Sequence, residues 1–433
     1  MATEIFPKRL LIVQRQYEQL RALLSAILPA NPFYAAKFDA AGAPTKVSRM
    51  GDLAEHFPFT TKDELVEDQR GNPPYGTNLT FPLNRYTRCH QTSGTADAPL
   101  RWLDTPESWG WMLGNWERVF RISGVTSEDK IFFAFSFGPF IGFWLAFEAA
   151  QRLGSLCIPG GGLSSAARLH AILDHRATVL CCTPTYALHL AEIAAVQKFD
   201  MAASAVKLLL VAGEPGGSIP SMRAQLETSW PGARVADHHG MTEVGPVSYP
   251  CPVRPCVLHI IESAYVAEIV DPATGAAIEA GHIGELVLTT LGRTGSPLVR
   301  YRTGDLVKRS LDTVCECGSS DLALEGGILG RTDDMVVVRG VNIYPTAVEE
   351  IVRSVGGITE YQVNVNTSSP LAELRMKIEA TPDCTDVAAL ISRLQQAFET
   401  AFSLRIPVTS VPPGALPRFE SKAKRWTKTA AES

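Results

Sequence analysis

Residues 91–102 read QTSGTADAPLRW, a cluster of Ser, Thr and Gly between two apolar stretches. Hydroxyls and unhindered backbone amides are suited to holding a phosphate, so this stretch is a candidate phosphate-binding loop. Ser, Thr and Gly are also ordinary turn residues, and such a cluster taken alone is more often a turn or a helix start. The interpretation therefore depends on the sequence around it.

Further clusters follow the loop in a fixed order. They are AGEP (212–215), DHHGMTEVG (237–245), GELVLTTLGRTGSPLVRYRTGDLV (from 284), GRTDDMVVVRGVNIYP (330–345) and LPRFESKAKRW (416–426). Together these motifs resemble the adenylate-forming superfamily of acyl-CoA synthetases. Segments that resemble its phenylacetate-CoA ligase-like branch in particular are NPFYAAKFDAAG (31–42), FPFTTKDEL (57–65), LVRYRTGDL (298–306) and RGVNIYP followed by EEIV. The resemblance covers nearly the whole chain.

Size and composition limit the class of protein. A chain of 433 residues is longer than the roughly 250 to 300 residues at which single cores stop growing, which indicates two domains. Hydrophobic residues make up 45% and charged residues 20%, and a formal net charge of -5 provides no basic field for nucleic acid. The N-terminus lacks a signal-peptide pattern and the nine cysteines indicate no disulfide framework, so we expect a cytoplasmic location.

Residues 131–147, IFFAFSFGPFIGFWLAF, carry no charge over 17 residues, which is the short end of what a membrane-spanning helix needs. Ser136, Gly138 and Pro139 interrupt the stretch, which favours a buried strand, loop and helix, and no membrane association is expected. Cys181 and Cys182 lie in another apolar run, VLCCTPTY, and are predicted to be buried thiols.

Short apolar runs alternate with helical patterns through much of the chain. Strands are predicted at residues 130–135, 178–182 and 206–211, and a helix at residues 164–173. This alternation predicts an α/β fold with parallel sheets and crossover helices. From Ala267 onward, strands separated by turn signals indicate a β-rich antiparallel section. Near the N-terminus, helical spacing predicts an amphipathic helix through Tyr17, Leu20, Leu24 and Ile27.

We therefore predict a large N-terminal domain at residues 1–327 and a small, mobile C-terminal α+β domain at residues 328–433. The hinge is expected near Asp333, in the glycine-containing segment GGILGRTDD. Beyond it, Pro345 suits the first turn of a helix, whose apolar stripe consists of Val348, Ile351, Val352 and Val355.

The resemblance implies an ATP site. Its expected pyrophosphate loop consists of Thr92, Ser93, Gly94 and Thr95. The loop departs from the family's usual SGTTGKP, because Ala98 replaces the lysine and Asp97 adds an acid, so Lys62 is a further candidate for a phosphate contact. Other expected nucleotide contacts are Gly213, Glu214 and Pro215 beside adenine; Asp237, His238, His239, Gly240 and Met241, with His239 replacing the usual tyrosine; Asp305 on ribose; and Arg331 on ribose or phosphate.

The resemblance also implies catalytic residues. Thr242 and Glu243 match the family's Thr-Glu pair, in which the hydroxyl meets the α-phosphate and the carboxylate holds Mg²⁺. Lys422 lies in RFESKAKRW, similar to the family's terminal loop SEGKA with Ser421 in place of glycine. Its ammonium would stabilise the charge that develops between the acyl carboxylate and the α-phosphate. Lys424 is the competing candidate.

Two further regions would handle the acyl group and its acceptor. Residues 133–143, FAFSFGPFIGF, resemble the family's aryl-pocket segment, with Phe137, Phe140 and Ile141 as acyl contacts and core packing as the alternative. After adenylation, the small domain would rotate about Asp333 to open a tunnel for the pantetheine of coenzyme A. Its expected lining is Arg339, Gly340, Val341 and Asn342.

Cysteine and histidine residues suggest a metal site. Cys315 and Cys317 form a tight pair in VCECGSS, while Cys251 and His259 lie in SYPCPVRPCVLHI. Some members of the resembled branch hold zinc in these regions, and three thiolates with one imidazole suit a tetrahedral structural zinc. Cys256 is an alternative to Cys251, and thiols without a metal are the alternative to a site.

We therefore expect an acid:CoA ligase that uses ATP and Mg²⁺ to form an acyl-adenylate from an aromatic carboxylic acid, and then a thioester with coenzyme A. One alternative is a stand-alone adenylation enzyme that transfers the acyl group to a carrier-protein phosphopantetheine or an amine. Another is a catalytically inactive nucleotide-binding regulator of the same fold. The sequence leaves a homodimer open.

Overall fold

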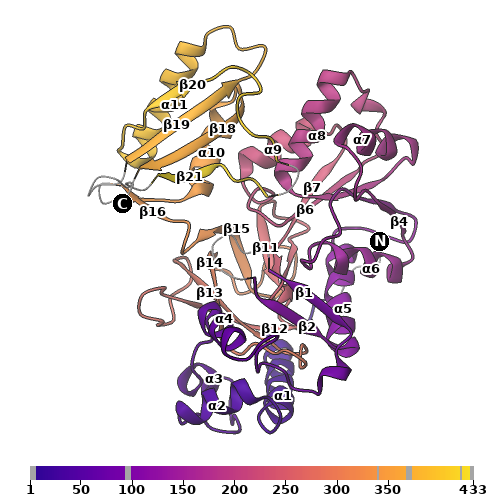
Figure 1. The fold of residues 1–433 in the computed structure, drawn as a ribbon, viewed down its shortest axis with the longest axis vertical. Coiled ribbons are helices and arrows are strands. Elements are labelled where there is room, and N and C mark those ends of the chain that lie inside the picture. Colours follow the sequence, from indigo (N-terminus) through magenta and orange to yellow (C-terminus); the bar gives the residue numbers. More distant parts are fainter. Residues whose placement is uncertain (1–5, 93–98, 339–340, 367–372, 420–421, 430–433) are drawn as a thin grey trace.

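The computed structural model describes residues 6–92, 99–338, 341–366, 373–419 and 422–429. In Figure 1 these residues form a large lobe, here residues 6–331, and a C-terminal lobe, here residues 336–429. Gly327, where the sequence places the domain boundary, lies inside a strand that continues to Arg331. The division into two domains with a hinge near Asp333 stays a prediction.

A five-stranded parallel sheet forms the centre of the large lobe, as the alternation of strands and helices predicts. Its order is β4-β3-β5-β6-β7, with β3 (Lys130–Phe133), β4 (Leu156–Pro159), β5 (Val179–Cys182), β6 (Leu208–Ala212) and β7 (Arg234–His238). Its helices are α5 (Pro106–Ile122), α6 (Trp144–Leu153), α7 (Ser165–Asp174), α8 (Pro184–Gln197) and α9 (Pro220–Ser229).

Helices cover both faces of this sheet because successive side chains of a strand point to opposite sides. Ile131 and Phe133 pack in the hydrophobic cluster that contains α5 and α6 residues, whereas Phe132 packs with α7, α8 and α9. The uncharged residues 131–147 therefore form a buried strand, a loop and the start of α6, as expected. Among the described residues, no helix combines the length and hydropathy needed to cross a bilayer.

A six-stranded antiparallel sheet follows, in the order β10-β11-β15-β14-β13-β12. Its strands are β10 (Ser248–Pro250), β11 (Val257–Ile260), β12 (Tyr265–Val270), β13 (Ile283–Thr290), β14 (Tyr301–Arg309) and β15 (Ala323–Arg331). The predicted β-rich section thus begins before Ala267. Two short hairpins complete the lobe, β1 (Arg88–Gln91) with β2 (Arg101–Asp104) and β8 (Gly240–Met241) with β9 (Gly245–Pro246).

Four N-terminal helices pack at one end of the large lobe (Figure 1). They are α1 (Arg9–Ile27), α2 (Pro32–Ala40), α3 (Gly51–His56) and α4 (Lys62–Gly71). Leu20, Leu24 and Ile27 of α1 are buried with residues of the next two helices, so the predicted amphipathic helix is confirmed. Single 3₁₀ turns occur at Leu83–Arg85 and Met201–Ala203.

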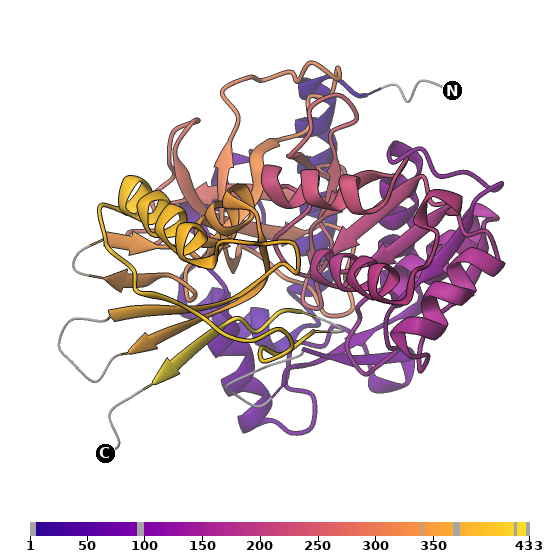
Figure 2. The ribbon, with the colours of Figure 1, turned by 90° about the horizontal axis from the view of Figure 1, so that it is seen from above.

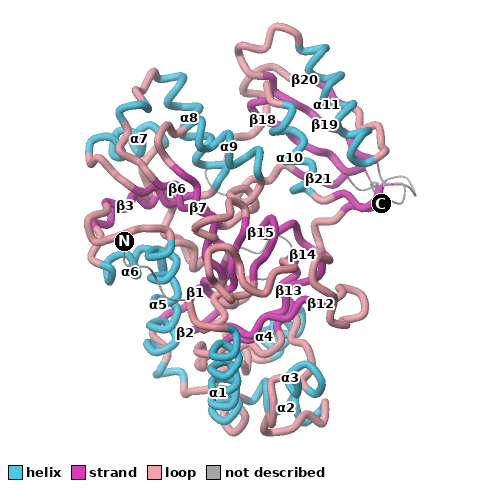
Figure 3. The backbone as a smooth tube through the Cα atoms, turned by 180° about the vertical axis from the view of Figure 1, so that it is seen from behind, coloured by secondary structure: helices cyan, strands magenta, loops and turns pink. Residues whose placement is uncertain are grey.

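The C-terminal lobe has its own hydrophobic core. Its sheet order is β20-β19-β18-β21, and the lobe contains β16 (Val336–Val338), β17 (Val341–Ile343), α10 (Pro345–Val355), β18 (Ile358–Asn366), β19 (Glu373–Ala380), α11 (Val387–Phe402), β20 (Val408–Ser410) and β21 (Trp426–Thr429). Pro345 begins α10, and Val348 and Val352 of this helix are buried, as predicted. Figure 3 shows both helices beside this sheet.

Polar contacts join the two lobes near α8 and α9, where the C-terminal lobe lies beside the large lobe (Figure 2). Ser221 Oγ of α9 donates to Glu350 Oε2 of α10 at 2.8 Å. Arg418 lies between two carboxylates, at 3.0 Å from Glu192 of α8 and 2.7 Å from Glu379 of β19. A cavity of about 470 Å³ between the lobes is lined from both sides, by residues that include Thr185 of α8 and Arg418 and Arg425 of the terminal motif. The structure therefore holds the C-terminal lobe docked.

Candidate functional site

The candidate site lies beyond the carboxyl ends of β6 and β7, where ligands bind in open α/β sheets. Gly213 follows β6 with a φ of +96°, a left-handed conformation that glycine adopts without strain. The segment Asp237 to Glu243 begins in β7 and turns through β8. The AGEP and DHHGMTE motifs therefore meet at one edge of the sheet, as their resemblance implies.

The base of the predicted phosphate loop is closed by the β1–β2 hairpin. Thr92 donates its backbone N–H to the Leu100 carbonyl at 2.9 Å, and its Oγ1 accepts from Leu100 N at 3.1 Å. These two bonds hold the ends of the loop together. Ser93, Gly94, Thr95 and the two departures, Asp97 and Ala98, lie outside the described residues.

Thr242 and Glu243 are both buried, and a buried arginine fixes their backbone. Arg293 Nη1 donates to the carbonyls of Thr242 at 2.7 Å and Glu243 at 2.8 Å. The same guanidinium makes two bonds to Asp104, at 2.7 Å and 2.6 Å, and both side chains are fully buried. Since Asp104 ends β2, this bidentate pair ties the β1–β2 hairpin, which carries the predicted phosphate loop, to Thr242 and Glu243.

Arg293 and Asp104 are functional candidates that the sequence reasoning missed. Arg293 lies in the quoted run LGRTGSPLVRYRTGDL, but nothing in that run distinguishes it from its neighbours. Its partner is 189 residues away along the chain. The only sequence signal was its presence in a motif shared with the resembled family.

Lys62 lies beside the Thr-Glu pair. It is the first residue of α4, after the N-cap Thr61, and its Nζ is 3.5 Å from Glu243 Oε1. The lysine side chain is 45% exposed, whereas the Glu243 side chain is 7% exposed. The structure thus brings the Lys62 ammonium to the carboxylate that is the candidate for Mg²⁺, while a contact between Lys62 and phosphate stays a prediction.

The two histidines of this segment have different environments. His238 is buried, its Nδ1 donates to the Ser248 carbonyl at 2.7 Å, and its ring lies 4.1 Å from that of Trp116. Burial lowers the pKa of His238 to about 3, so the ring is neutral at physiological pH. His238 therefore supports the turn from within rather than facing a ligand.

His239 and Asp237 flank this buried ring. His239 Nε2 is 3.2 Å from Asp305 Oδ2, without the alignment of a hydrogen bond. The Asp237 carboxylate accepts from Ser218 Oγ at 2.6 Å, and burial raises its pKa. Gly240 and Met241 form β8 and are half-buried. His239 is thus the member of this group that points to the candidate ribose position.

Asp305 and Arg331 stand opposite each other on the paired strands β14 and β15. Arg331 Nη1 donates to Asp305 Oδ1 at 3.2 Å, and its Nε donates to Asp333 Oδ1 at 2.8 Å. Burial lowers the pKa of Arg331, but the two carboxylates outweigh it and leave the pKa raised. Asp305 Oδ2 is buried and has no hydrogen-bond partner among the described residues. A ribose hydroxyl would satisfy that oxygen.

Lys422 reaches the site from the C-terminal lobe. Its Cε lies 3.7 Å from the point where a Cβ on Gly213 would stand. The next residue, Ala423, donates its N–H to Glu214 Oε2 at 2.7 Å, while Glu214 Oε1 accepts from Thr185 N at 2.9 Å. Pro215 is exposed beside them, and the competing Lys424 is exposed. The structure therefore brings the terminal loop to the AGEP turn.

The expected acyl-pocket residues lie in an aromatic cluster. The Phe137 ring is 4.7 Å from the rings of both Phe135 and Trp144. Phe140 folds over Gly142, where an added Cβ would come within 3.0 Å of its ring, and Ile141 is buried. The Pro139 carbonyl accepts from Gln91 N at 2.9 Å, which places this segment against the base of the phosphate loop.

The expected tunnel lining is described only in part. Val341 and Asn342 lie in β17 and pair with Val338 and Val337 of β16, whereas Arg339 and Gly340 lie outside the described residues. Asp333 precedes this hairpin. Burial raises its pKa, but the bonds from Arg331 outweigh that effect and leave the pKa lowered.

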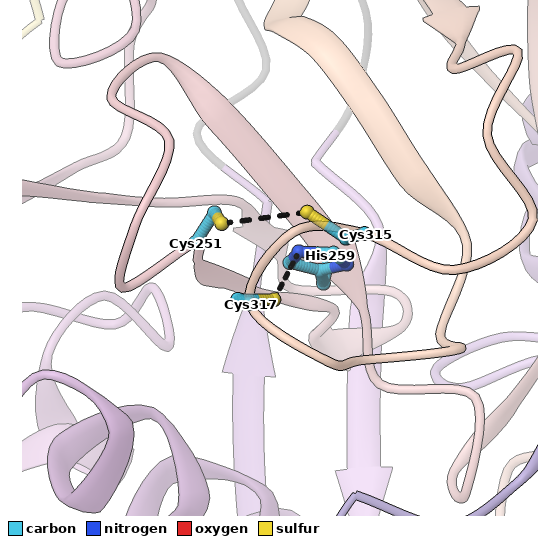
Figure 4. A group of neighbouring side chains, drawn as sticks. All are labelled: Cys251, His259, Cys315 and Cys317. Atoms are coloured by element: carbon cyan, nitrogen blue, oxygen red, sulfur yellow. Dashed lines mark hydrogen bonds between the residues drawn. The ribbon is translucent and has the colours of Figure 1, made fainter.

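Cys251, His259, Cys315 and Cys317 meet in one group, whose ligand atoms lie within 4.8 Å of one another (Figure 4). Cys251 Sγ is 3.7 Å from Cys315 Sγ, and Cys317 Sγ is 3.5 Å from His259 Nε2. A tetrahedral zinc with bonds of about 2.0 to 2.3 Å separates its ligands by roughly 3.5 to 3.8 Å. The donor set and spacing therefore fit zinc.

The surroundings of this group also suit a metal. His259 Nδ1 donates to the Asp321 carbonyl at 3.2 Å, which leaves Nε2 to face the three sulfurs. Cys256 lies outside the group, so the structure favours Cys251 between the two alternatives. Cys181 and Cys182 are fully buried in β5, and burial raises the pKa of both thiols, as expected for inert core residues.

Comparisons with known proteins identify the family of the chain. Residues 114–292 match the family model described as AMP-binding enzyme, and residues 340–429 match that of the AMP-binding enzyme C-terminal domain. The phenylacetate-coenzyme A ligase of Escherichia coli (strain K12) is 31% identical over 424 residues, which cover 95% of this chain and 93% of that protein. That of Pseudomonas putida is 30% identical over 419 residues, which cover 95% and 92%.

Solved structures of 2-hydroxyisobutyryl-CoA ligase have the same fold. Its postadenylation state in complex with 2-HIB-AMP has a TM-score of 0.89 at 25% identity, covering 98% of this chain and 91% of that chain. Its thioesterification state with 2-HIB-AMP and CoA has a TM-score of 0.70 at 26% identity, covering 99% and 91%. The lobes are therefore arranged more like the postadenylation state. With these relatives matched over almost its full length, the chain belongs to the phenylacetate-coenzyme A ligase family of AMP-binding enzymes.

Proposed function

We propose that this protein is an AMP-forming acid:CoA ligase that acts on an aromatic carboxylic acid. In the first half-reaction, a carboxylate oxygen attacks the α-phosphorus of ATP and pyrophosphate leaves. In the second, the thiolate of coenzyme A attacks the acyl carbonyl and AMP leaves. The observation that supports this function most is the approach of Lys422 to Gly213, at the sheet edge that also carries Thr242 and Glu243.

Each residue of the site has a proposed part in adenylation. Lys422 would stabilise the charge that develops on the bridging oxygens, and Thr242 would donate to the α-phosphate. Glu243, a buried carboxylate, would hold Mg²⁺, a hard cation that neutralises phosphate charge when it is bound. Asp305, with its unpartnered Oδ2 among the described residues, would accept from the ribose.

Remaining contacts would orient the nucleotide and the acid. Arg331 and His239 flank Asp305, the turn at Gly213 to Pro215 would border adenine, and the loop that begins at Thr92 would hold pyrophosphate. The aromatic cluster around Phe137 and Phe140 supports an aryl acid, because ring contacts favour flat apolar groups. Rotation about Asp333, with residues 339–342 lining the pantetheine path, is proposed for the second half-reaction.

Zinc bound by Cys251, His259, Cys315 and Cys317 is proposed as a structural metal. Four protein ligands leave no open position for water, so it takes no part in the reaction. It would tie β11 and the segment before it to the loop between β14 and β15. A cytoplasmic location and a homodimer remain predictions.

Pyrophosphate release across a panel of aryl and alkyl acids, with and without coenzyme A, tests this function. Aryl acids should release pyrophosphate, and coenzyme A should yield a thioester; adenylate formation without a thioester would favour a carrier protein or an amine as acceptor. Lys422→Ala should slow adenylation by about a hundredfold or more while ATP still binds. Lys424→Ala is the matched control. A loss of adenylation in Lys424→Ala with normal adenylation in Lys422→Ala would overturn the assignment to Lys422.

A further inference from the structure

The Glu214 carboxylate joins three parts of the protein. One oxygen accepts from Thr185 N at 2.9 Å, and the other accepts from Ala423 N at 2.7 Å. Thr185 lies at the start of α8 in the large lobe, whereas Ala423 belongs to the C-terminal lobe and directly follows Lys422. Both carboxylate oxygens are therefore used within the protein, and one of them holds the catalytic loop.

The geometry around Glu214 favours this contact. Gly213 and Glu214 directly follow β6, so the parallel sheet places the backbone of the turn that carries the carboxylate. The first turn of α8 directs its N–H groups and the positive end of its helix dipole at the carboxylate, which stabilises the anion. With the loop held there, the Lys422 side chain passes directly over Gly213.

We propose that Glu214 is a positioning residue for Lys422 and acts in the adenylation half-reaction only, an inference that rests on the proposed function. Its carboxylate docks the loop through Ala423 N–H and thereby places the ammonium over the α-phosphate. When the C-terminal lobe rotates, this bond breaks and the carboxylate is solvated. This role differs from a direct contact with adenine, because it acts through the bond from Ala423 N–H to the carboxylate.

Glu214→Gln tests the role, since an amide has one oxygen and one NH₂ group and cannot accept a bond at both carboxylate positions. A hydrogen bond to a charged acceptor corresponds to about a 10- to 100-fold change in an equilibrium. We therefore expect acyl-adenylate formation to slow by about that factor, with an unchanged KM for ATP. Thioester formation from supplied acyl-adenylate and coenzyme A should keep its wild-type rate.

Two comparisons separate positioning from general docking. In a Lys422→Ala background, Glu214→Gln should cause no further loss, because the residue it positions is gone. Ser221→Ala is the matched control: it removes the interlobe bond to Glu350, far from Lys422 along the chain, and should affect adenylation much less. An unchanged adenylation rate in Glu214→Gln, an equal loss in both half-reactions, or an additive loss beside Lys422→Ala would overturn the inference.

A wild-type enzyme that forms no acyl-adenylate would refute the proposed function instead, so the two failures are distinguishable. If Glu214→Gln fails to fold because α8 loses its contact, Ala423→Pro removes the other partner and leaves α8 unaltered. The same selective loss of adenylation in that variant supports the role, and an unchanged adenylation rate contradicts it.

Discussion

Replacing Arg293 with alanine should both destabilise the large lobe and impair adenylation. The guanidinium and Asp104 are fully buried and make two short hydrogen bonds, so its removal leaves an unpaired buried carboxylate. Breaking a buried pair in this way costs about 3 to 5 kcal/mol. The carbonyls of Thr242 and Glu243 also lose their donor, at about 1 to 3 kcal/mol each when no water replaces it. A loss of at least about 5 kcal/mol is expected.

A double variant separates stability from positioning. Arg293→Met with Asp104→Val removes both charges, and apolar replacement of a buried ion pair is often neutral or stabilising. The double variant should therefore recover at least half of the stability lost in Arg293→Ala. Adenylation should remain slowed by about 10- to 100-fold, since the backbone of Thr242 and Glu243 still lacks its anchor.

Urea unfolding followed by tryptophan fluorescence provides the assay, with Trp102 lying 5.4 Å from the Arg293 guanidinium. Pyrophosphate release reports adenylation in the same preparations. The reasoning is wrong if Arg293→Ala unfolds within about 1 kcal/mol of wild type, which is the size of an ordinary substitution. It is also wrong if the double variant is no more stable than the single one, or if it regains full activity.

Three further outcomes are expected. Lys62→Ala should raise the KM for MgATP about tenfold with little effect on stability, because Lys62 is a half-exposed charge 3.5 Å from Glu243; an unchanged KM would remove it from the phosphate site. Cys317→Ser should lower the zinc content measured by mass spectrometry and the melting temperature together, whereas full stability without metal would argue against a structural zinc. Burial lowers the pKa of His238 to about 3, so only the unfolded chain binds this proton between pH 6.5 and 3. Stability therefore falls as the pH drops below 6.5, by about 1.4 kcal/mol per pH unit at most. His238→Gln should flatten that part of the urea-denaturation profile, and an unaltered slope would contradict the burial argument.

Much of the large lobe could be predicted from local patterns. The apolar runs at residues 130–135, 178–182 and 206–211 became β3, β5 and β6, with ends that shifted by one to two residues. Strands buried on both faces give continuous apolar runs, which is why these elements were visible in the sequence. The predicted helix at residues 164–173 likewise became α7.

The parts that could not be predicted depend on pairs far apart in the chain. Arg293 finds Asp104 across 189 residues, and Glu214 finds Ala423 across 209. In the sequence, an arginine or glutamate of a motif looks the same whether its side chain faces solvent, a ligand or another loop. Only the fold shows which backbone amides a carboxylate accepts from, so the bonds of Glu214 to Thr185 and Ala423 could not be read from the AGEP motif, while its place beside adenine stays a prediction.

The motif residues show the same limit within one segment. His238 and His239 are neighbours with the same side chain, yet one is sealed beneath Trp116 and the other approaches Asp305. The two histidines lie where the chain passes from β7 into β8, and their side chains point in different directions. A motif match predicts that both histidines contact the nucleotide. A resemblance therefore locates a site more reliably than it assigns the individual side chains.

The position of Arg418 between Glu192 and Glu379 bears on how easily the enzyme changes state. Glu379 belongs to the same lobe as Arg418, so this cation would keep its counter-ion in the proposed rotation. Glu192 would be released, and it is a partly exposed carboxylate that water accommodates readily. If the C-terminal lobe rotates as proposed, such a shared charge would narrow the energy difference between the two arrangements, so that modest differences in substrate affinity would suffice to drive the change.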